Sequence, residues 1–174
     1  MSSASDLLKK IKDENIKFVD MRFTDPRGKV HHITMDQSAV DEDMFQDGVM
    51  FDGSSIGGWK AINESDMALM PDASTAVMDP FSAQPQLILF CDIREPSTGQ
   101  GYNRDPRSVA KRAEEYLKST GIGDTVFCGP ELEFFVFDDV RYDVSMNRAM
   151  YEFDSEEDPY VTGKTLPDSN MGHR

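Results

Sequence analysis

Residues 50–59 read MFDGSSIGGW and place a carboxylate, two hydroxyls, three glycines and the only tryptophan of the chain within ten positions. Two apolar residues lead in, and the glycines then allow backbone conformations that other residues rarely adopt. We therefore expect a tight loop that carries Asp52 and Ser55. Its role is either structural, as an Asx turn that binds its own backbone, or functional. The large Trp59 side chain needs a surface to pack against, and a partner subunit is one candidate for that surface.

The chain before this loop predicts a short helix and a hairpin. A capped helix is expected to end near Asn15. Residues 16–35 alternate apolar and polar side chains on both sides of the turn sequence DPRG at 25–28, which is typical of a β-hairpin. His31 and His32 are adjacent in its second strand and point to opposite faces, so one metal ion cannot bind both.

Short apolar runs at 67–70, 75–78 and 87–93 are separated by proline-containing turns, which predicts a sheet with tight connections. The segment 1–103 is therefore expected to be one α+β domain, closed by a linker at 95–101. The segment 104–174 begins with the clearest helix of the chain, capped by Asp105 and ended by Gly121. Residues 125–128 and 131–137 have the composition of strands, and 141–174 that of a long loop or an unfolded tail.

A second chemical feature is the pair Glu131 and Glu133. On a strand these side chains share one face, and the residues that follow are apolar on both faces, which indicates a buried strand. Two carboxylates are costly to bury unless a cation offsets their charge, and Mg²⁺ or Mn²⁺ prefers such oxygen ligands. The alternative is a strand end that lies in water.

Composition restricts the partners. The net charge is −14, from 32 acidic and 18 basic residues, so nucleic acid and anionic membranes are poor partners. The N-terminus lacks a long apolar run, so we expect neither a signal peptide nor a membrane span. Cys91 and Cys128 stand alone among apolar neighbours, which predicts buried free thiols and a reducing, cytoplasmic location.

Three motifs, read in order, closely resemble those of the bacterial type I glutamine synthetases, which are glutamate–ammonia ligases. They are MFDGSSIGGWKAINESDMALMPD at 50–72, NRDPRSVAKRAEEYLKSTG at 103–121 and GPELEFFVFDD at 129–139. The likeness begins at KFVDMRFTDPRG, from residue 17, and weakens only around 142–170. It implies an N-terminal β-grasp domain over about 1–103, and then the start of a catalytic domain over 104–174.

The resemblance also implies roles for individual residues. Asp52 matches the carboxylate that binds ammonium and takes its proton, and Ser55 matches a hydroxyl beside that ammonium. Glu131 and Glu133 match metal ligands, on the nucleotide side and the glutamate side respectively. Trp59 matches a tryptophan at the subunit boundary. The implied cofactor is Mg²⁺ or Mn²⁺, with ATP as co-substrate although no Walker motif is present.

The family further implies a homo-oligomer, a dodecamer of two six-membered rings in which the Asp52 loop serves the neighbouring subunit. Its members are considerably longer than 174 residues, so we expect this sequence to be the N-terminal part of such an enzyme and inactive alone. One alternative is a freestanding β-grasp module that docks on full-length subunits. A weaker one is a related ligase that acts on other amines. Intact Glu131 and Glu133 favour the enzyme over the module, and the intact Asp52 loop favours ammonia.

Overall fold

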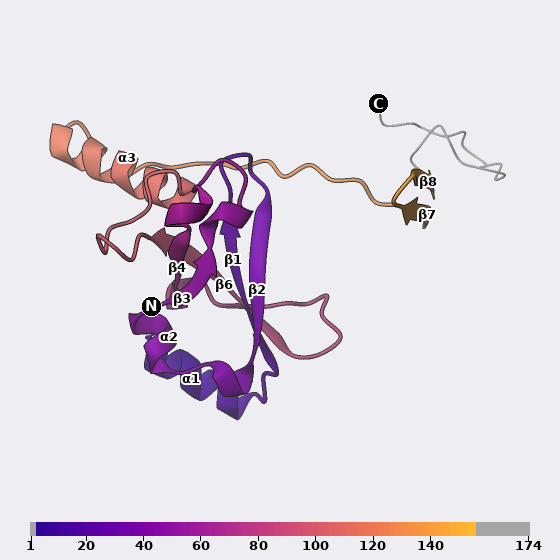
Figure 1. The fold of residues 1–174 in the computed structure, drawn as a ribbon, viewed down its shortest axis with the longest axis horizontal. Helices are drawn as coiled ribbons and strands as arrows, with labels where there is room; N and C mark the ends of the chain where they lie inside the picture. The colour runs from indigo at the N-terminus through magenta and orange to yellow at the C-terminus, as the bar shows by residue number, and fades with distance from the viewer. Residues whose placement is uncertain (1–2, 156–174) are drawn as a thin grey trace. The chain divides into compact units, whose positions relative to one another are not determined.

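A computed structural model describes residues 3–155 of the 174-residue chain. Within these residues the chain forms two compact units, the first ending at Val126 and the second beginning at Phe127. The elements of the first unit are α1 (Ala4–Asp13), β1 (Phe18–Thr24), β2 (Val30–Asp36), α2 (Glu42–Gln46), β3 (Val49–Asp52), β4 (Asp66–Pro71), β5 (Val77–Met78), β6 (Gln86–Arg94) and α3 (Pro106–Thr120) (Figure 1).

The sheet of the first unit is mixed. Its strand order is β2-β1-β6-β4-β3, and β5 adds to β6. The central strands β1 and β6 are parallel, and the other pairings are antiparallel. β1 and β2 form the hairpin predicted for 16–35, β4 and β6 cover the predicted apolar runs at 67–70 and 87–93, and β5 contains only the last two residues of the run at 75–78. The sequence thus predicted these strands but not β3, whose residues were expected to lead into a loop.

The core lies between this sheet and the helices α1 and α2. Leu7 and Ile11 of α1 and Met44 of α2 are buried against it. The largest fully buried apolar side chains come mainly from the three central strands: Val19, Met21, Met67, Leu69, Leu87, Leu89 and Ile93. Burial of one such side chain contributes about 1.5–3 kcal/mol, so this core holds the first unit together.

The two adjacent histidines point to opposite faces of β2, as predicted. His31 Nε2 lies 3.0 Å from Asp25 Oδ2, and its ring stacks on Phe23. His32 Nδ1 lies 2.7 Å from Oδ1 of Asp20, which is fully buried. Each histidine therefore has its own carboxylate partner, and the two do not form one site.

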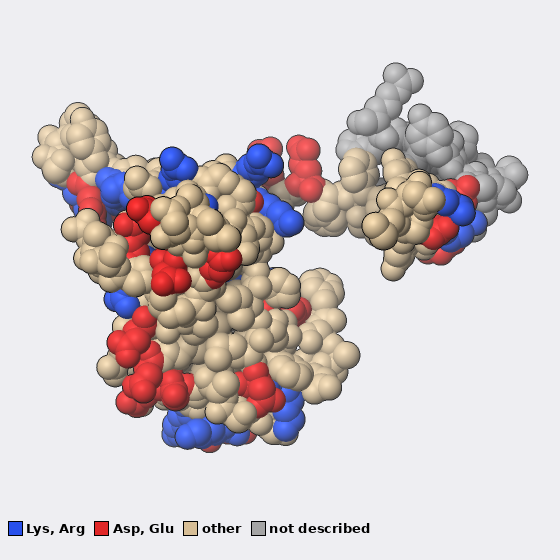
Figure 2. Space-filling view, in the orientation of Figure 1, with Lys and Arg blue, Asp and Glu red and all other residues tan. Residues whose placement is uncertain are grey.

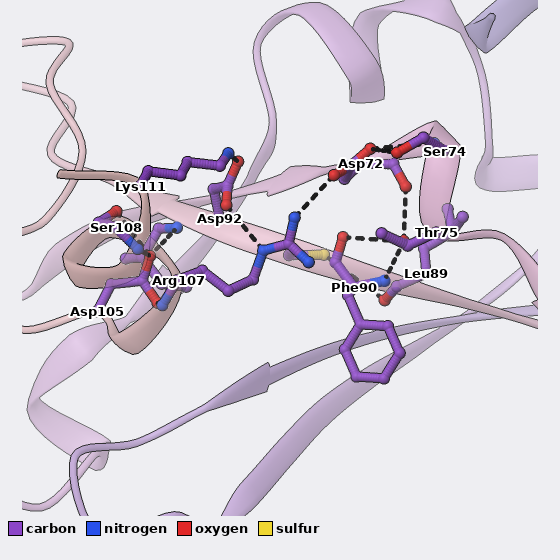
Figure 3. Close-up of polar contacts among 12 residues, drawn as sticks. Asp72, Ser74, Thr75, Leu89, Phe90, Asp92, Asp105, Arg107, Ser108 and Lys111 are labelled. Carbon is purple, nitrogen blue, oxygen red and sulfur yellow. Dashed lines mark hydrogen bonds and ion pairs between the residues drawn. The ribbon is translucent and has the colours of Figure 1, made fainter. Parts of the chain in front are cut away.

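Helix α3 is fastened to the sheet by a charged network. Arg107 donates from Nε to Asp92 Oδ1 at 2.9 Å and from Nη2 to Asp72 Oδ2 at 2.7 Å, and Lys111 also binds Asp92 (Figure 3). The helix begins after the predicted cap Asp105, whose Oδ2 accepts from the Ser108 backbone N–H and hydroxyl. It ends at Gly121, where φ is 68°. Its N-terminal part is thus fixed by side-chain contacts to β6 and to Asp72, the residue that follows β4.

Uncharged residues cover most of the viewed surface of this unit, with acidic residues in several groups across it and basic residues mainly near its upper and lower edges (Figure 2). No helix among residues 3–155 combines the length and the apolar character that crossing a membrane requires. Of the two thiols, Cys91 is buried as predicted, and burial raises its pKa to about 12. Cys128 is exposed, so its predicted burial was wrong.

Residues from 125 onward correct two further predictions. Residues 125–128 and 131–137 form no strand, because no strand pairs with them within the described residues. Residues predicted to be an unstructured loop instead form an antiparallel hairpin of β7 (Asp139–Ser145) and β8 (Arg148–Asp154). The remainder of the predicted tail, 156–174, lies outside the described residues.

Candidate ammonium-binding loop and metal ligands

The loop over residues 52–59 begins where β3 ends. Asp52 pairs with Asp66 across β3 and β4, and the next backbone N–H, of Gly53, donates to Ser65 O at 2.7 Å. A Cβ at Gly53 would lie 2.6 Å from Met67 Cγ, so the close approach of loop and strand requires glycine here. The start of the loop is therefore fixed by the sheet.

Asp52 forms the Asx turn that the sequence suggested. Its Oδ1 accepts from the Ser54 backbone N–H at 2.8 Å and from the Ser54 hydroxyl at 2.6 Å. Its Oδ2 accepts from the Ser55 hydroxyl at 3.2 Å. These hydrogen bonds, those of Ser54 first, hold the pKa of Asp52 below its usual value. Asp52 is exposed, so the loop presents a stable negative charge to the solvent.

Asp52 and Ser55 also line one side of a cavity of about 540 Å³. Phe23, Phe51 and Ile33 contribute its apolar wall. Lys29, His31 and His32 line the same cavity, so its lining carries groups of both signs. At the loop itself, the ionised Asp52 carboxylate attracts positive charge, and the Ser55 hydroxyl can accept a hydrogen bond beside it.

Trp59 closes the loop from inside the first unit. Its ring packs against Phe23, Phe51 and Tyr102, with centroid distances of 5.6, 6.1 and 5.4 Å. The side chain is 6% exposed, and its Nε1 has no hydrogen-bond partner among the described atoms. The chain therefore buries this tryptophan in its own core, and no partner subunit is needed to cover it.

Glu131 and Glu133 belong to the second unit, in an extended stretch between Phe127 and β7. Both are exposed, as are the intervening Leu132 and the following Phe134. The structure thus brings Asp52 and Ser55 together in one loop, and it shows the two glutamates as a separate exposed pair. Within residues 3–155 no group of three or more histidine, cysteine or acidic side chains is arranged to hold a metal ion.

Sequence reasoning missed the residues that hold the far end of the loop. Arg104 Nη1 donates to Gly58 O at 2.6 Å, and the Tyr102 hydroxyl donates to Trp59 O at 3.1 Å. The motif at 103–106 signals a helix cap, but nothing local indicates a contact with residues more than forty positions earlier.

Comparison with known proteins identifies the family. The family model described as the glutamine synthetase β-grasp domain matches residues 15–96, and the one described as the glutamine synthetase catalytic domain matches 103–172. The chain belongs to the glutamine synthetase family. Its first unit contains the β-grasp domain of this family, and the start of the catalytic domain follows, which confirms the predicted fold class.

Individual proteins of known sequence or structure are similar to this chain over most of its length. A glutamine synthetase of Azospirillum brasilense is 62% identical over all 174 residues, which span 37% of that protein. A 3-hydroxylaminophenol mutase of Cupriavidus pinatubonensis is 55% identical over 172 residues, 99% of this chain and 36% of the mutase. A cryo-EM structure of Plasmodium falciparum glutamine synthetase matches with a TM-score of 0.74 and 27% identity, over 94% of this chain and 32% of the other. The chain thus spans about a third of the length of each of these relatives.

Proposed function

We propose that this chain contributes the ammonium-binding loop and two metal ligands to a glutamine synthetase, which joins ammonia to glutamate at the expense of ATP. The observation that carries this proposal is the match, in order and over nearly the whole chain, to both domains of the family. The geometry of Asp52 supports it, because an exposed, ionised carboxylate suits a cationic substrate.

The reaction requires two steps. The terminal phosphoryl group of ATP passes to the glutamate side chain and gives an acyl phosphate and ADP. Ammonia then attacks the acyl carbon, phosphate leaves, and one proton of the ammonium must be removed for the nitrogen to act as a nucleophile. Asp52 attracts the cation and accepts its hydrogen bond, and the Ser55 hydroxyl offers a second contact beside it. We assign this proton to Asp52, which its hydrogen bonds keep ionised and therefore able to bind the cation and then accept its proton.

Glu131 and Glu133 are the proposed ligands of Mg²⁺ or Mn²⁺. Their donor set fits, because both are carboxylates with exposed oxygens, which such hard cations prefer. Bound metal would neutralise charge on the phosphoryl oxygens during transfer. We place Glu131 on the nucleotide side and Glu133 on the glutamate side.

We further propose a homo-oligomer of two stacked six-membered rings, in which Asp52 acts in the site of the neighbouring subunit. A freestanding docking module is disfavoured, because the match continues into the catalytic domain and a module has no need of Glu131 and Glu133. The mutase relative is a reason to measure the activity directly, because 55% identity here accompanies a differently named enzyme.

The first test is a glutamine-forming assay with ATP, glutamate, ammonium and Mg²⁺. The complete product of the gene should form glutamine, and the 174-residue chain alone should not, because two metal ligands cannot hold both substrates in reacting geometry. Sustained turnover by the purified chain would show that our division of the site is wrong.

The second test mixes two variants of the complete product. Asp52→Ala and Glu133→Ala should each be nearly inactive alone, since every site carries one lesion. After dissociation and joint reassembly, about a quarter of the sites should combine an intact Glu133 with an intact Asp52 from the neighbour, by random pairing around the ring. Mixed rings that form but stay as inactive as either parent would refute the action of Asp52 across the subunit boundary.

A further inference from the structure

The loop over residues 52–59 is held at both ends by different parts of the sequence. Its front end is fixed by β3 and β4, through the Gly53 N–H that donates to Ser65 O. In the middle, the N–H of Ile56 donates to Gly53 O and that of Trp59 donates to Ile56 O, each at 3.2 Å. Consecutive turns of this kind link the two ends, so a displacement of one end is passed along the loop.

The far end of the loop meets the chain just before α3. Arg104 Nη1 lies 2.6 Å from Gly58 O and 3.4 Å from Trp59 O, so one charged group binds two successive carbonyls. Gly58 has a φ of 85° and open space beside its Cα, whereas the side chain of Trp59, the next residue, is packed in the core. The Arg104 guanidinium and the Tyr102 hydroxyl therefore add polar contacts to the backbone at this end of the loop, beside the packing of Trp59.

Arg104 in turn stands on a rigid support. The next residue, Asp105, is 1% exposed and caps α3 through Ser108. Two residues further on, Arg107 binds Asp92 of β6 and Asp72, the residue that follows β4 (Figure 3). The backbone that carries Arg104 is thus fixed to β6 and to the end of β4 and is not an independent surface segment.

We propose that Arg104 is a positioning residue: together with the Tyr102 hydroxyl it holds the far end of the loop over residues 52–59 from the start of α3, and so limits the movement of Ser54 and Ser55, whose hydrogen bonds orient the Asp52 carboxylate. Arg104 belongs to the segment matched by the catalytic-domain model, whereas Gly58 belongs to the β-grasp segment. The contact makes the ammonium-binding loop depend on the junction between the two domains. We call the hydrogen bonds from Arg104 to Gly58 O and Trp59 O the clamp. The effect of the clamp on catalysis rests on the proposed function, but the existence of the clamp does not.

Arg104→Ala in the 174-residue chain tests the clamp by amide hydrogen exchange. The Trp59 amide should exchange about fivefold faster, and the Ser54 amide, which donates to Asp52, should also exchange faster, because a charged hydrogen bond is lost at the far end. The fluorescence of Trp59, the only tryptophan, should become more sensitive to acrylamide. Unchanged exchange at both amides overturns the proposal, and so does a change confined to Trp59, because the clamp would then not reach Asp52.

Arg94→Ala is the matched control. Arg94 Nη2 also donates to a backbone carbonyl, that of Asp47, at 3.0 Å. The Arg94→Ala substitution removes one positive charge and one hydrogen bond to a backbone carbonyl from the first unit, as Arg104→Ala does, but Arg94 does not contact the loop over residues 52–59. Exchange at Ser54 and Trp59 should stay as in the unaltered chain. Equal acceleration by both variants would mean that loss of charge alone loosens the loop, which overturns the role of Arg104.

The catalytic consequence is tested in the complete gene product. Arg104→Ala should raise the KM for ammonium several-fold and leave the KM values for ATP and glutamate unchanged, because only the loop is displaced. If Asp52→Ala leaves activity intact, the proposed function fails, while the exchange result on the clamp stands. If Asp52→Ala abolishes activity and Arg104→Ala changes neither exchange nor the KM for ammonium, the positioning role fails and the proposed function stands.

Discussion

The loop at Asp52 and the stretch at Glu131 carry the same kind of chemistry in very different structural settings. Asp52 is held by hydrogen bonds from Ser54 and Ser55, three residues away at most, and the loop rests on a buried core. Glu131 lies in an extended segment whose apolar neighbours Leu132 and Phe134 are 86% and 80% exposed. One acidic site is thus formed by local contacts, and the other needs contacts that the described residues do not supply.

Hydrogen exchange should show the largest difference between these regions. Amides of β1 and β6, such as those of Met21 and Leu89, should exchange about a thousandfold or more slowly than those of residues 131–137. The reason is that the first set is hydrogen-bonded within a buried sheet and the second has no strand pairing within the described residues. Equal, strong protection in both regions would remove the contrast.

A pair of identical substitutions provides the second test. Leu89→Ala empties a fully buried position and should lower the free energy of unfolding by about 2–5 kcal/mol. Leu132→Ala changes a side chain that is 86% exposed and should alter it by about 0.5 kcal/mol or less. Urea unfolding measures both, followed by Trp59 fluorescence for the first unit and by far-UV circular dichroism for the whole chain. A large loss from Leu132→Ala would indicate that the second region is packed in solution.

Removing an arginine that forms ion pairs, once in each unit, should change the free energy of unfolding less than Leu89→Ala does. Arg107→Ala leaves Asp72 and Asp92 without their shared partner and should cost roughly 1–2 kcal/mol, because the side chain is only partly exposed. Arg141→Ala removes a bond to Asp154 in the second unit and should leave the unfolding of the first unit unchanged. The same urea experiment distinguishes them, and equal effects would mean that the two units unfold together.

The same contrast explains what the sequence could predict. Alternating apolar residues with strong turn signals placed β1, β2, β4, β5, β6 and α3 correctly, because these signals act over a few residues. The pattern at 131–137 has equal strand character but forms no strand, because a strand also needs a partner that the pattern does not name. The hairpin of β7 and β8 was missed although β7 alternates polar and apolar side chains, because the acidic residues, glycines and proline further along made the whole stretch from 141 resemble a loop.

The candidate site divides in the same way. The Asx turn at Asp52 could be predicted, because aspartate followed by glycine and serine favours it locally. The clamp by Arg104 could not, because its two partners are 46 and 45 residues away. The predicted domain boundary near residue 103 and the roles of Asp52, Ser55, Glu131 and Glu133 remain predictions.

The smallest expected effect concerns the ionisation of Asp52. Ser54 supplies the two shortest hydrogen bonds to its carboxylate, so Ser54→Ala removes the hydroxyl donor and should move the pKa of Asp52 upward, toward its ordinary value. Ser55→Ala removes one bond of 3.2 Å and should move it less. A carbon-detected NMR titration of the carboxyl group measures both shifts.

The sign of the shift also predicts how the loop responds to pH. Because the pKa of Asp52 is lower in the folded chain than in the unfolded chain, its ionised form stabilises the turn above the unfolded pKa. That contribution is lost as the pH falls through the folded pKa, and exchange of the Ser54 amide should then accelerate. In Ser54→Ala the acceleration should begin at a higher pH. If the exchange rate of the Ser54 amide changes with pH only as that of an unprotected amide does, the turn does not depend on the charge of Asp52. The Asp52 loop would then be less ordered than we infer from its comparison with the Glu131 segment.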